Sequence, residues 1–255
     1  MTPNPPKTTC LTCRLSDLCL PFGLQVGEIE ALEIIIKIKR PLQINELLYS
    51  KDEICKSLYA VKSGSFRSYI INSEGMEQTI GFYLPGELMG LDALFQGRFS
   101  NSVDALETSS VCELPLDRLT ELCLKIPNLQ HQMTRILSKE ITTNHEQMLL
   151  LGQSSAKVKV ATFLLMLSKR YGSLGYSNTT FNLSMRRNDI ANYLSVSHET
   201  ISRQLTILSK EKVITIKQRT VNIIDLNLLK SIVEPCLTDS HTHSDQKFSV
   251  INKLG

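Results

Sequence analysis

The stretch Met185–Ser209, MRRNDIANYLSVSHETISRQLTILS, contains two amphipathic segments separated by a short polar turn. The first segment repeats apolar side chains at helical spacing: Ile190, Tyr193 and Leu194. In the second segment, one apolar stripe is formed by Ile201, Leu205 and Leu208. Because such spacing places apolar side chains on one face of a helix, the pattern predicts two helices packed through a tight turn. The second helix is expected from about His198 to Ser209.

The opposite face of this second helix carries polar side chains suited to hydrogen bonding with bases. Ser197 is a favourable helix N-cap, and an acidic residue in the first turn stabilises the positive end of the helix. Arginine pairs with guanine, and glutamate accepts from cytosine, in the major groove of DNA. We therefore predict a DNA-recognition helix whose exposed face carries His198, Glu199, Ser202, Arg203 and Thr206.

The sequence around this helix supports a winged helix-turn-helix domain over residues 154–235. A β-hairpin is predicted from Val213–Ile216 and Thr220–Ile224, with a basic tip at Lys217–Arg219. Residues 154–224 hold 11 Lys/Arg and 3 Asp/Glu, whereas residues 1–153 hold 14 and 18. A basic domain of this kind is typical of proteins that contact nucleic-acid phosphates.

Residues 23–127 precede this region and are predicted to form a β-roll sensor domain. From about Ile29 to Pro115, short runs of β-forming residues alternate with turn signals, for example in Leu58–Val61, Phe66–Ile71 and Gln78–Leu84. No segment of helical periodicity is expected within this range. Together with the C-terminal helices, these strands predict an α+β fold.

Residues 128–153 have the periodicity of a coiled-coil helix. The seam residues recur at spacings of 4, 3, 4 and 3: Leu137, Ile141, Asn144, Met148 and Leu151. A helix from about Asn128 to Gly152 would be about 37 Å long. Such a helix can pack on its own domain. Asn144 favours a homodimer instead, because an asparagine in the seam can pair with its symmetry mate.

Cysteines are concentrated in an N-terminal arm, residues 1–22. Cys10, Cys13 and Cys19 form a C-x2-C-x5-C motif, and Cys112 lies far away in the chain. Four thiolates suit either a [4Fe–4S] cluster or a structural zinc ion. The remaining cysteines are expected to be buried or incidental thiols: Cys55, Cys123 and Cys236.

The composition also indicates what the chain is not expected to be. The N-terminus has no apolar signal segment, and the longest apolar runs are too short to span a bilayer, so no membrane association and a cytoplasmic location are expected. The five histidines are not near a candidate nucleophile or paired acids, so no enzymatic activity is expected. Residues 236–255 lack periodicity and are expected to be disordered.

Several segments resemble the CRP/FNR family of transcription regulators, and within it the fumarate and nitrate reduction (FNR) group. The similar segments are CLTCRLSDLCLPF (Cys10–Phe22), SLYAVKSG (Ser57–Gly64), ALETSSVCELP (Ala105–Pro115) and DIANYLSVSHETISR (Asp189–Arg203). The resemblance covers about Cys10 to Leu229, and its spacing of three cysteines plus one makes it specific.

This resemblance implies an oxygen-responsive regulator of anaerobic-metabolism genes. It implies that Cys10, Cys13, Cys19 and Cys112 bind an oxygen-labile [4Fe–4S] cluster, which oxygen converts to [2Fe–2S] and then destroys. It also implies that the intact cluster promotes dimerisation and binding to palindromic promoter DNA, read by Glu199, Ser202 and Arg203, and that RNA polymerase is a partner. A structural zinc ion or a thiol–disulfide switch at the four cysteines remains the alternative.

The chain departs from the family pattern at positions that bear on ligand and target. His198 and Asn144 stand where the FNR pattern usually has a small apolar and an acidic residue, respectively. Gly86–Glu87 resembles the start of the phosphate-binding segment of cyclic-AMP receptors, but the Arg-Ser pair of those receptors is missing from Gly97–Ala105. A buried phosphate needs such a partner, so no cyclic nucleotide is expected to bind.

Overall fold

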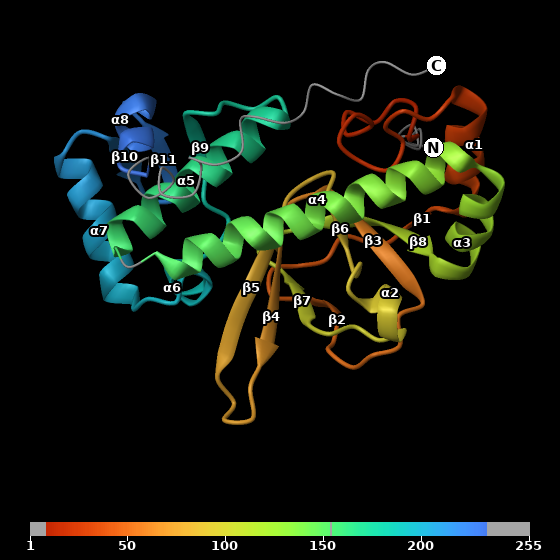
Figure 1. The fold of residues 1–255 in the computed structure, drawn as a ribbon, viewed down its shortest axis with the longest axis horizontal. Helices are drawn as coiled ribbons and strands as arrows, with labels where there is room; N and C mark the ends of the chain where they lie inside the picture. Colours follow the sequence, from red (N-terminus) through yellow and green to blue (C-terminus); the bar gives the residue numbers. More distant parts are fainter. Residues whose placement is uncertain (1–8, 154, 234–255) are drawn as a thin grey trace, which may run out of the picture.

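The computed structural model describes residues 9–153 and 155–233, which form a β-rich domain and a helical domain connected by one long helix (Figure 1). The predicted α+β architecture is confirmed. The expected disordered tail, residues 236–255, and Cys236 lie outside the described residues. Within the described residues, no helix is long and apolar enough to cross a membrane.

The N-terminal domain is a β-roll made of two four-stranded antiparallel sheets. One sheet has the order β1-β8-β3-β6 and the other β2-β7-β4-β5. Their buried side chains form a common core that includes Leu58, Phe66, Val103 and Leu114. The strands are β1 (Lys37–Ile38), β2 (Leu47–Tyr49), β3 (Ser57–Ser63), β4 (Phe66–Ile71), β5 (Glu77–Tyr83), β6 (Leu88–Met89), β7 (Ser102–Ala105) and β8 (Ser110–Pro115).

The prediction that no helix interrupts this range was wrong. The described chain has α1 (Val26–Ile35) and the short α2 (Ala93–Gln96) there, and α3 (Leu116–Lys125) follows β8 directly. The β-branched run in α1 suggests a strand, but the Glu28 carboxylate accepts from the backbone N–H of Gln25 at 2.7 Å and caps a helix. Packing of α1 against α3 also overrides local β-propensity.

Helix α4 (Pro127–Gly152) connects the two domains and has 26 residues, close to the predicted length. It begins with proline at its first turn, where the missing N–H has no intrahelical partner to lose. Leu129 and Met133 pack in the core of the roll, whereas Leu150 belongs to the C-terminal core. One helix therefore contributes side chains to both cores.

The C-terminal domain combines helices with a small antiparallel sheet of order β10-β11-β9. Helices α6 and α7 form the predicted helix-turn-helix, and α7 extends one residue beyond the predicted end. The predicted hairpin is present as β10 and β11. The elements are α5 (Ala156–Ser173), β9 (Thr180–Asn182), α6 (Arg187–Leu194), α7 (His198–Lys210), β10 (Ile214–Lys217), β11 (Thr220–Ile223) and α8 (Leu226–Ser231).

The two domains also meet directly, where β5 packs against α6. Phe82 of β5 is 6 % exposed, and its ring centroid lies 6.1 Å from that of Phe163 and 5.1 Å from that of Tyr193. Beside this aromatic contact, Arg67 of β4 pairs with Asp104 of the roll at 2.7 Å and with Asp189 of α6 at 3.0 Å. The contact is therefore an apolar centre with an ion-pair network at its side.

The substitution Phe82→Ala is expected to destabilise the protein because it removes a buried ring shared by both domains. A large-to-small change of this kind costs about 3–5 kcal/mol. Urea denaturation followed by circular dichroism measures the loss. Phe95→Ala is the control, because Phe95 is 89 % exposed and its removal is expected to change stability by less than about 0.5 kcal/mol. Equal stability of the two variants would contradict the interdomain packing.

Candidate metal centre and nucleic-acid interface

The cysteine arm folds into tight turns that bring its three thiols to one side. The backbone N–H of Cys13 donates to the carbonyl of Cys10 at 3.3 Å, and that of Cys19 donates to the carbonyl of Leu15 at 2.9 Å. Leu20 of the arm is buried in the core of the roll, and two further contacts fix the arm to this domain. The N–H of Cys10 donates to the Glu33 carboxylate of α1 at 2.7 Å, and Leu18 packs over the turn at Gly86.

Gly86 permits this close approach of the arm. Its φ of +87° is a backbone conformation that side-chain-bearing residues rarely adopt. A Cβ atom at this position would also lie 3.0 Å from Leu18 Cβ. Glycine at this turn therefore brings the arm against the β5–β6 connection.

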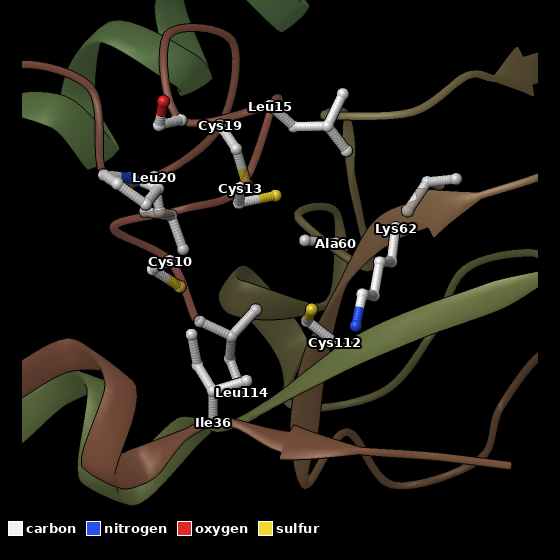
Figure 2. Close-up of a pocket in the computed structure, with 13 residues that line it drawn as sticks. Cys10, Cys13, Leu15, Cys19, Leu20, Ile36, Ala60, Lys62, Cys112 and Leu114 are labelled. Carbon is white, nitrogen blue, oxygen red and sulfur yellow. The ribbon is translucent and has the colours of Figure 1, made fainter. Parts of the chain in front are cut away.

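The four predicted ligand cysteines line one hollow (Figure 2). Cys10, Cys13 and Cys19 reach it from the arm, and Cys112 reaches it from β8. Most of the other lining side chains are apolar: Leu15, Leu20, Pro21, Ile36, Ala60, Val61 and Leu114, with Ser16 and Lys62 as polar exceptions. The fold thus gathers the four thiols that the sequence separates by up to 102 positions.

The sulfur atoms surround this hollow instead of converging on one point (Figure 2). Within the described ranges, no group of three or more His, Cys, Asp or Glu side chains is arranged to hold a single metal ion. A tetrahedral zinc site needs every sulfur about 2.3 Å from one ion. An iron–sulfur cluster takes one thiolate at each of several irons, so its ligands stand farther apart.

The apolar lining affects the ionisation of the thiols. Burial raises the pKa of Cys19 to about 12, and burial, followed by the proximity of Cys112, raises the pKa of Cys10 to about 12. Burial also raises the pKa of Cys112, and the positive charge of Lys62 opposes this shift. Metal binding at this site would therefore release protons from neutral thiols. Lys62 supplies the one positively charged side chain among the residues that line the hollow.

The predicted dimer seam lies along α4 with three members exposed. Ile141 is 57 % and Met148 70 % exposed, and Asn144 between them is also exposed. Leu137 is half-buried against the core of the roll, and Leu151 is half-buried near the end of the helix. Exposed apolar side chains at this spacing are typical of a helix that pairs with a partner. Leu149, which was not predicted, is 60 % exposed.

The helix-turn-helix places the predicted DNA-contacting residues on one accessible face. His198, Glu199, Arg203 and Thr206 of α7 are exposed, whereas Ile201, Leu205 and Leu208 are buried as predicted. Ser197 Oγ accepts from the Thr200 backbone N–H at 3.1 Å, which caps the helix. Hydrogen bonds from the N–H of Glu199 itself and from the Ser197 hydroxyl hold the pKa of the Glu199 carboxyl below its usual value.

Ser202, the remaining residue predicted on this face, is half-buried and has a partner that sequence reasoning missed. Arg187 of α6 donates to Ser202 Oγ at 3.1 Å. Arg187 also lines a cavity between α6, α7 and the hairpin, together with Arg186, Gln218 and Arg219. The Arg186-Arg187 pair at the start of α6 was the available signal, but only the fold shows that it lies beside the basic hairpin tip.

Each of the two domains matches a known domain family. Residues 39–125 match the cyclic nucleotide-binding domain family, and residues 158–232 match the Crp-like helix-turn-helix domain family. Glu87, the residue in the stretch that resembles a phosphate-binding segment, accepts from the Leu84 N–H at 2.9 Å and pairs with Arg170 of α5 at 2.5 Å.

Curated relatives are similar over most of the chain. The "Anaerobic regulatory protein" of Haemophilus influenzae is 42% identical over 218 residues, which cover 86% of this chain and 85% of the relative. The "Fumarate and nitrate reduction regulatory protein" of Escherichia coli is 41% identical over 214 residues, covering 84% and 86%. The "Transcriptional activator protein Anr" of Pseudomonas protegens is 41% identical over 216 residues, covering 85% and 88%.

Solved structures show the same architecture. The structure of FixK2 from Bradyrhizobium japonicum superposes with a TM-score of 0.71 at 26% sequence identity, covering 78% of this chain and 97% of that chain. A CRP-family transcriptional regulator from Thermus thermophilus has a TM-score of 0.63 at 19% identity, covering 77% and 97%. At 19% identity, the similarity to this second structure shows only that the fold is shared.

Removing the N-cap of α7 is expected to weaken the helix-turn-helix. Ser197→Ala leaves the Thr200 N–H without its acceptor and should lower the free energy of unfolding by about 1 kcal/mol. Chemical denaturation measures the loss. The control is Ser209→Ala, at a hydroxyl that forms no hydrogen bond within residues 9–153 and 155–233. An equal loss in both variants would refute the capping role of Ser197.

Proposed function

The chain belongs to the CRP/FNR family of transcription regulators, and on that premise we propose that it switches gene expression in response to oxygen through a [4Fe–4S] cluster. The observation that carries the proposal is the gathering of Cys10, Cys13, Cys19 and Cys112 around one apolar hollow. The names of the similar proteins, an anaerobic regulator and a fumarate and nitrate reduction regulator, support the same response.

The donor set suits the proposed cofactor. Four cysteine thiolates are the usual ligands of a [4Fe–4S] cluster, and sulfurs arranged around a hollow match a group with several irons better than one ion. When bound, the cluster supplies the oxygen-reactive chemistry. A structural zinc ion or a thiol–disulfide switch is the alternative that the same four thiols leave open.

The protein's own side chains protect and compensate this site. Leu15, Leu20 and Leu114 line the hollow and restrict access of water. Lys62 places a positive charge beside thiolates that are costly to ionise in an apolar setting. Because three ligands come from the arm and one comes from β8, ligation would tie the arm to the roll.

The exposed members of the predicted dimer seam, Ile141, Asn144 and Met148, form a stripe on α4. This dimer stripe would then pair two copies of the chain. Ile141 and Met148 would bury apolar surface against the partner helix, and Asn144 would lie beside its symmetry mate. An interface with so few exposed apolar side chains would be marginal, so a small change in the first turns of α4 can shift the monomer–dimer equilibrium.

A dimer would present two α7 helices to a palindromic DNA site. In helix-turn-helix dimers the recognition helices enter successive major grooves about 34 Å apart. Glu199, Ser202 and Arg203 are proposed to contact base edges, with His198 beside them, and Arg187 and Arg219 to contact phosphates. Promoter-bound dimers of this family would act on RNA polymerase to activate or repress anaerobic-metabolism genes.

DNA binding in the presence and absence of oxygen tests the proposal. Anaerobically purified protein is expected to be brown, to contain iron and acid-labile sulfide, and to bind a palindromic site at least tenfold more tightly than after exposure to air. That difference corresponds to about 1.4 kcal/mol of binding free energy. Cys112→Ser should abolish the colour and the difference, whereas Cys123→Ser, outside the hollow, should retain both.

Two outcomes would contradict the proposal of an oxygen-responsive [4Fe–4S] cluster. Equal DNA binding in both states would remove the oxygen response and leave only the regulator. Colourless protein with one zinc ion per chain would support the structural-zinc alternative.

The neutral side chain at Asn144 leads to a separate prediction about dimerisation. An exposed Asn144 repels its mate less than an acidic residue would, so cluster-free protein is expected to dimerise measurably. Asn144→Asp should weaken the cluster-free dimer about tenfold, or about 1.4 kcal/mol, in sedimentation equilibrium. Thr142→Asp, on the same helix but outside the stripe, is the charge-matched control. Strictly monomeric cluster-free protein at high concentration would refute the prediction.

A further inference from the structure

The first turns of α4 are contacted at three places, twice by the arm and once by α1. Gln132 Nε2 donates to the carbonyl oxygen of Cys19 at 3.1 Å. The Arg135 guanidinium lies over the Phe22 ring, 4.1 Å from its centroid. Asn128 Nδ2 donates to the Glu28 carboxylate of α1 at 2.9 and 3.1 Å. The arm and the dimer helix are therefore in direct contact.

The contact of Gln132 differs from the other two because it is buried. Gln132 is 8 % exposed and lies between Leu129 and Met133, which are 0 % and 7 % exposed. Asn128 and Arg135 are exposed. A buried amide that loses its acceptor cannot turn to water for another, so the Gln132 hydrogen bond is more costly to break.

The acceptor is the backbone of a proposed ligand. Cys19 directs its sulfur into the hollow and its carbonyl oxygen toward α4. Movement of the Cys19 peptide therefore changes the acceptor of Gln132. Because α4 is one continuous helix of 26 residues, a shift of its first turns also moves the stripe at Ile141 and Met148.

We propose that Gln132 is the positioning residue through which α4 senses whether Cys19 is held by its metal group. This inference rests on the proposed function. With Cys19 held, the Gln132 amide has its buried acceptor and the first turns of α4 keep the position that favours pairing of two stripes. When Cys19 is released, the arm moves and the Gln132 amide loses its hydrogen-bond acceptor. The first turns of α4 then shift until this amide has another acceptor. The two states then differ in dimer affinity.

The variant Gln132→Met tests this coupling. Methionine has a similar length and suits the apolar surroundings of Leu129 and Met133, but it donates no hydrogen bond. Gln130→Met is the matched control, since Gln130 lies in the same part of α4, is exposed, and uses its side chain in no hydrogen bond within the described ranges. Both full-length variants are purified without oxygen beside the wild type.

Three quantities are compared for each protein: the iron and acid-labile sulfide content with the visible spectrum, the thermal unfolding midpoint, and the dimer dissociation constant before and after removal of iron. Gln132→Met is expected to retain cluster content within twofold. Its ratio of the cluster-free to the cluster-bound dissociation constant should fall at least tenfold toward one. Gln130→Met should keep the wild-type ratio.

The possible failures are distinguishable. A wild-type ratio retained in Gln132→Met would overturn the coupling while leaving the proposed function intact. Loss of the cluster in both Gln132→Met and the same-size variant Gln132→Glu would assign Gln132 to holding the site, and would also overturn it. A wild type without iron, or with equal dissociation constants in both states, would remove the proposed function itself.

Discussion

Helix α4 has to satisfy two hydrophobic cores at once, and the arrangement of the molecule depends on this constraint. Leu129 and Met133 pack in the roll, and Leu150 packs in the C-terminal core. Because a helix rises about 1.5 Å per residue, these positions fix the separation of the domains along its axis. Its remaining face, with Ile141 and Met148, is exposed and available for a partner. One continuous helix therefore connects the core of the roll, the exposed face and the core of the helix-turn-helix domain.

Polar contacts determine how the domains are oriented around this helix. Arg67 of the roll bonds to Asp189 at 3.0 Å, and Asp189 also caps α6 by accepting from the Arg186 N–H at 2.7 Å. Arg170 of α5 pairs with Glu87 of the roll. Buried ion pairs add little net stability, but breaking one leaves an uncompensated charge. They therefore favour one docking geometry, in which Phe82, Leu84 and Leu106 of the roll are buried in the C-terminal core.

The cysteine site also joins segments that are far apart in the chain. Its three arm thiols reach the roll because Gly86 allows Leu18 to approach and Glu33 accepts from the Cys10 N–H. The arm in turn contacts α4 through Gln132. In the proposed coupling, a change at the thiols reaches the dimer stripe through the Cys19 carbonyl, Gln132 and the continuous helix α4.

The sequence by itself determined the features that depend on local periodicity and capping. It located the recognition helix through Ile201, Leu205 and Leu208, and it grouped Cys10, Cys13 and Cys19 by their spacing. It missed α1, because a β-branched run has strand propensity and only the Glu28 cap and packing on α3 make it helical. The family resemblance had pointed to Cys112 as the fourth ligand, and the structure places it at the same hollow as the three arm cysteines. The partnership of Arg187 with Ser202 and the hydrogen bond from Gln132 to Cys19 were decided by the tertiary structure alone. These contacts join residues far apart in the chain, and sequence spacing carries no information about which distant side chains the packing brings together.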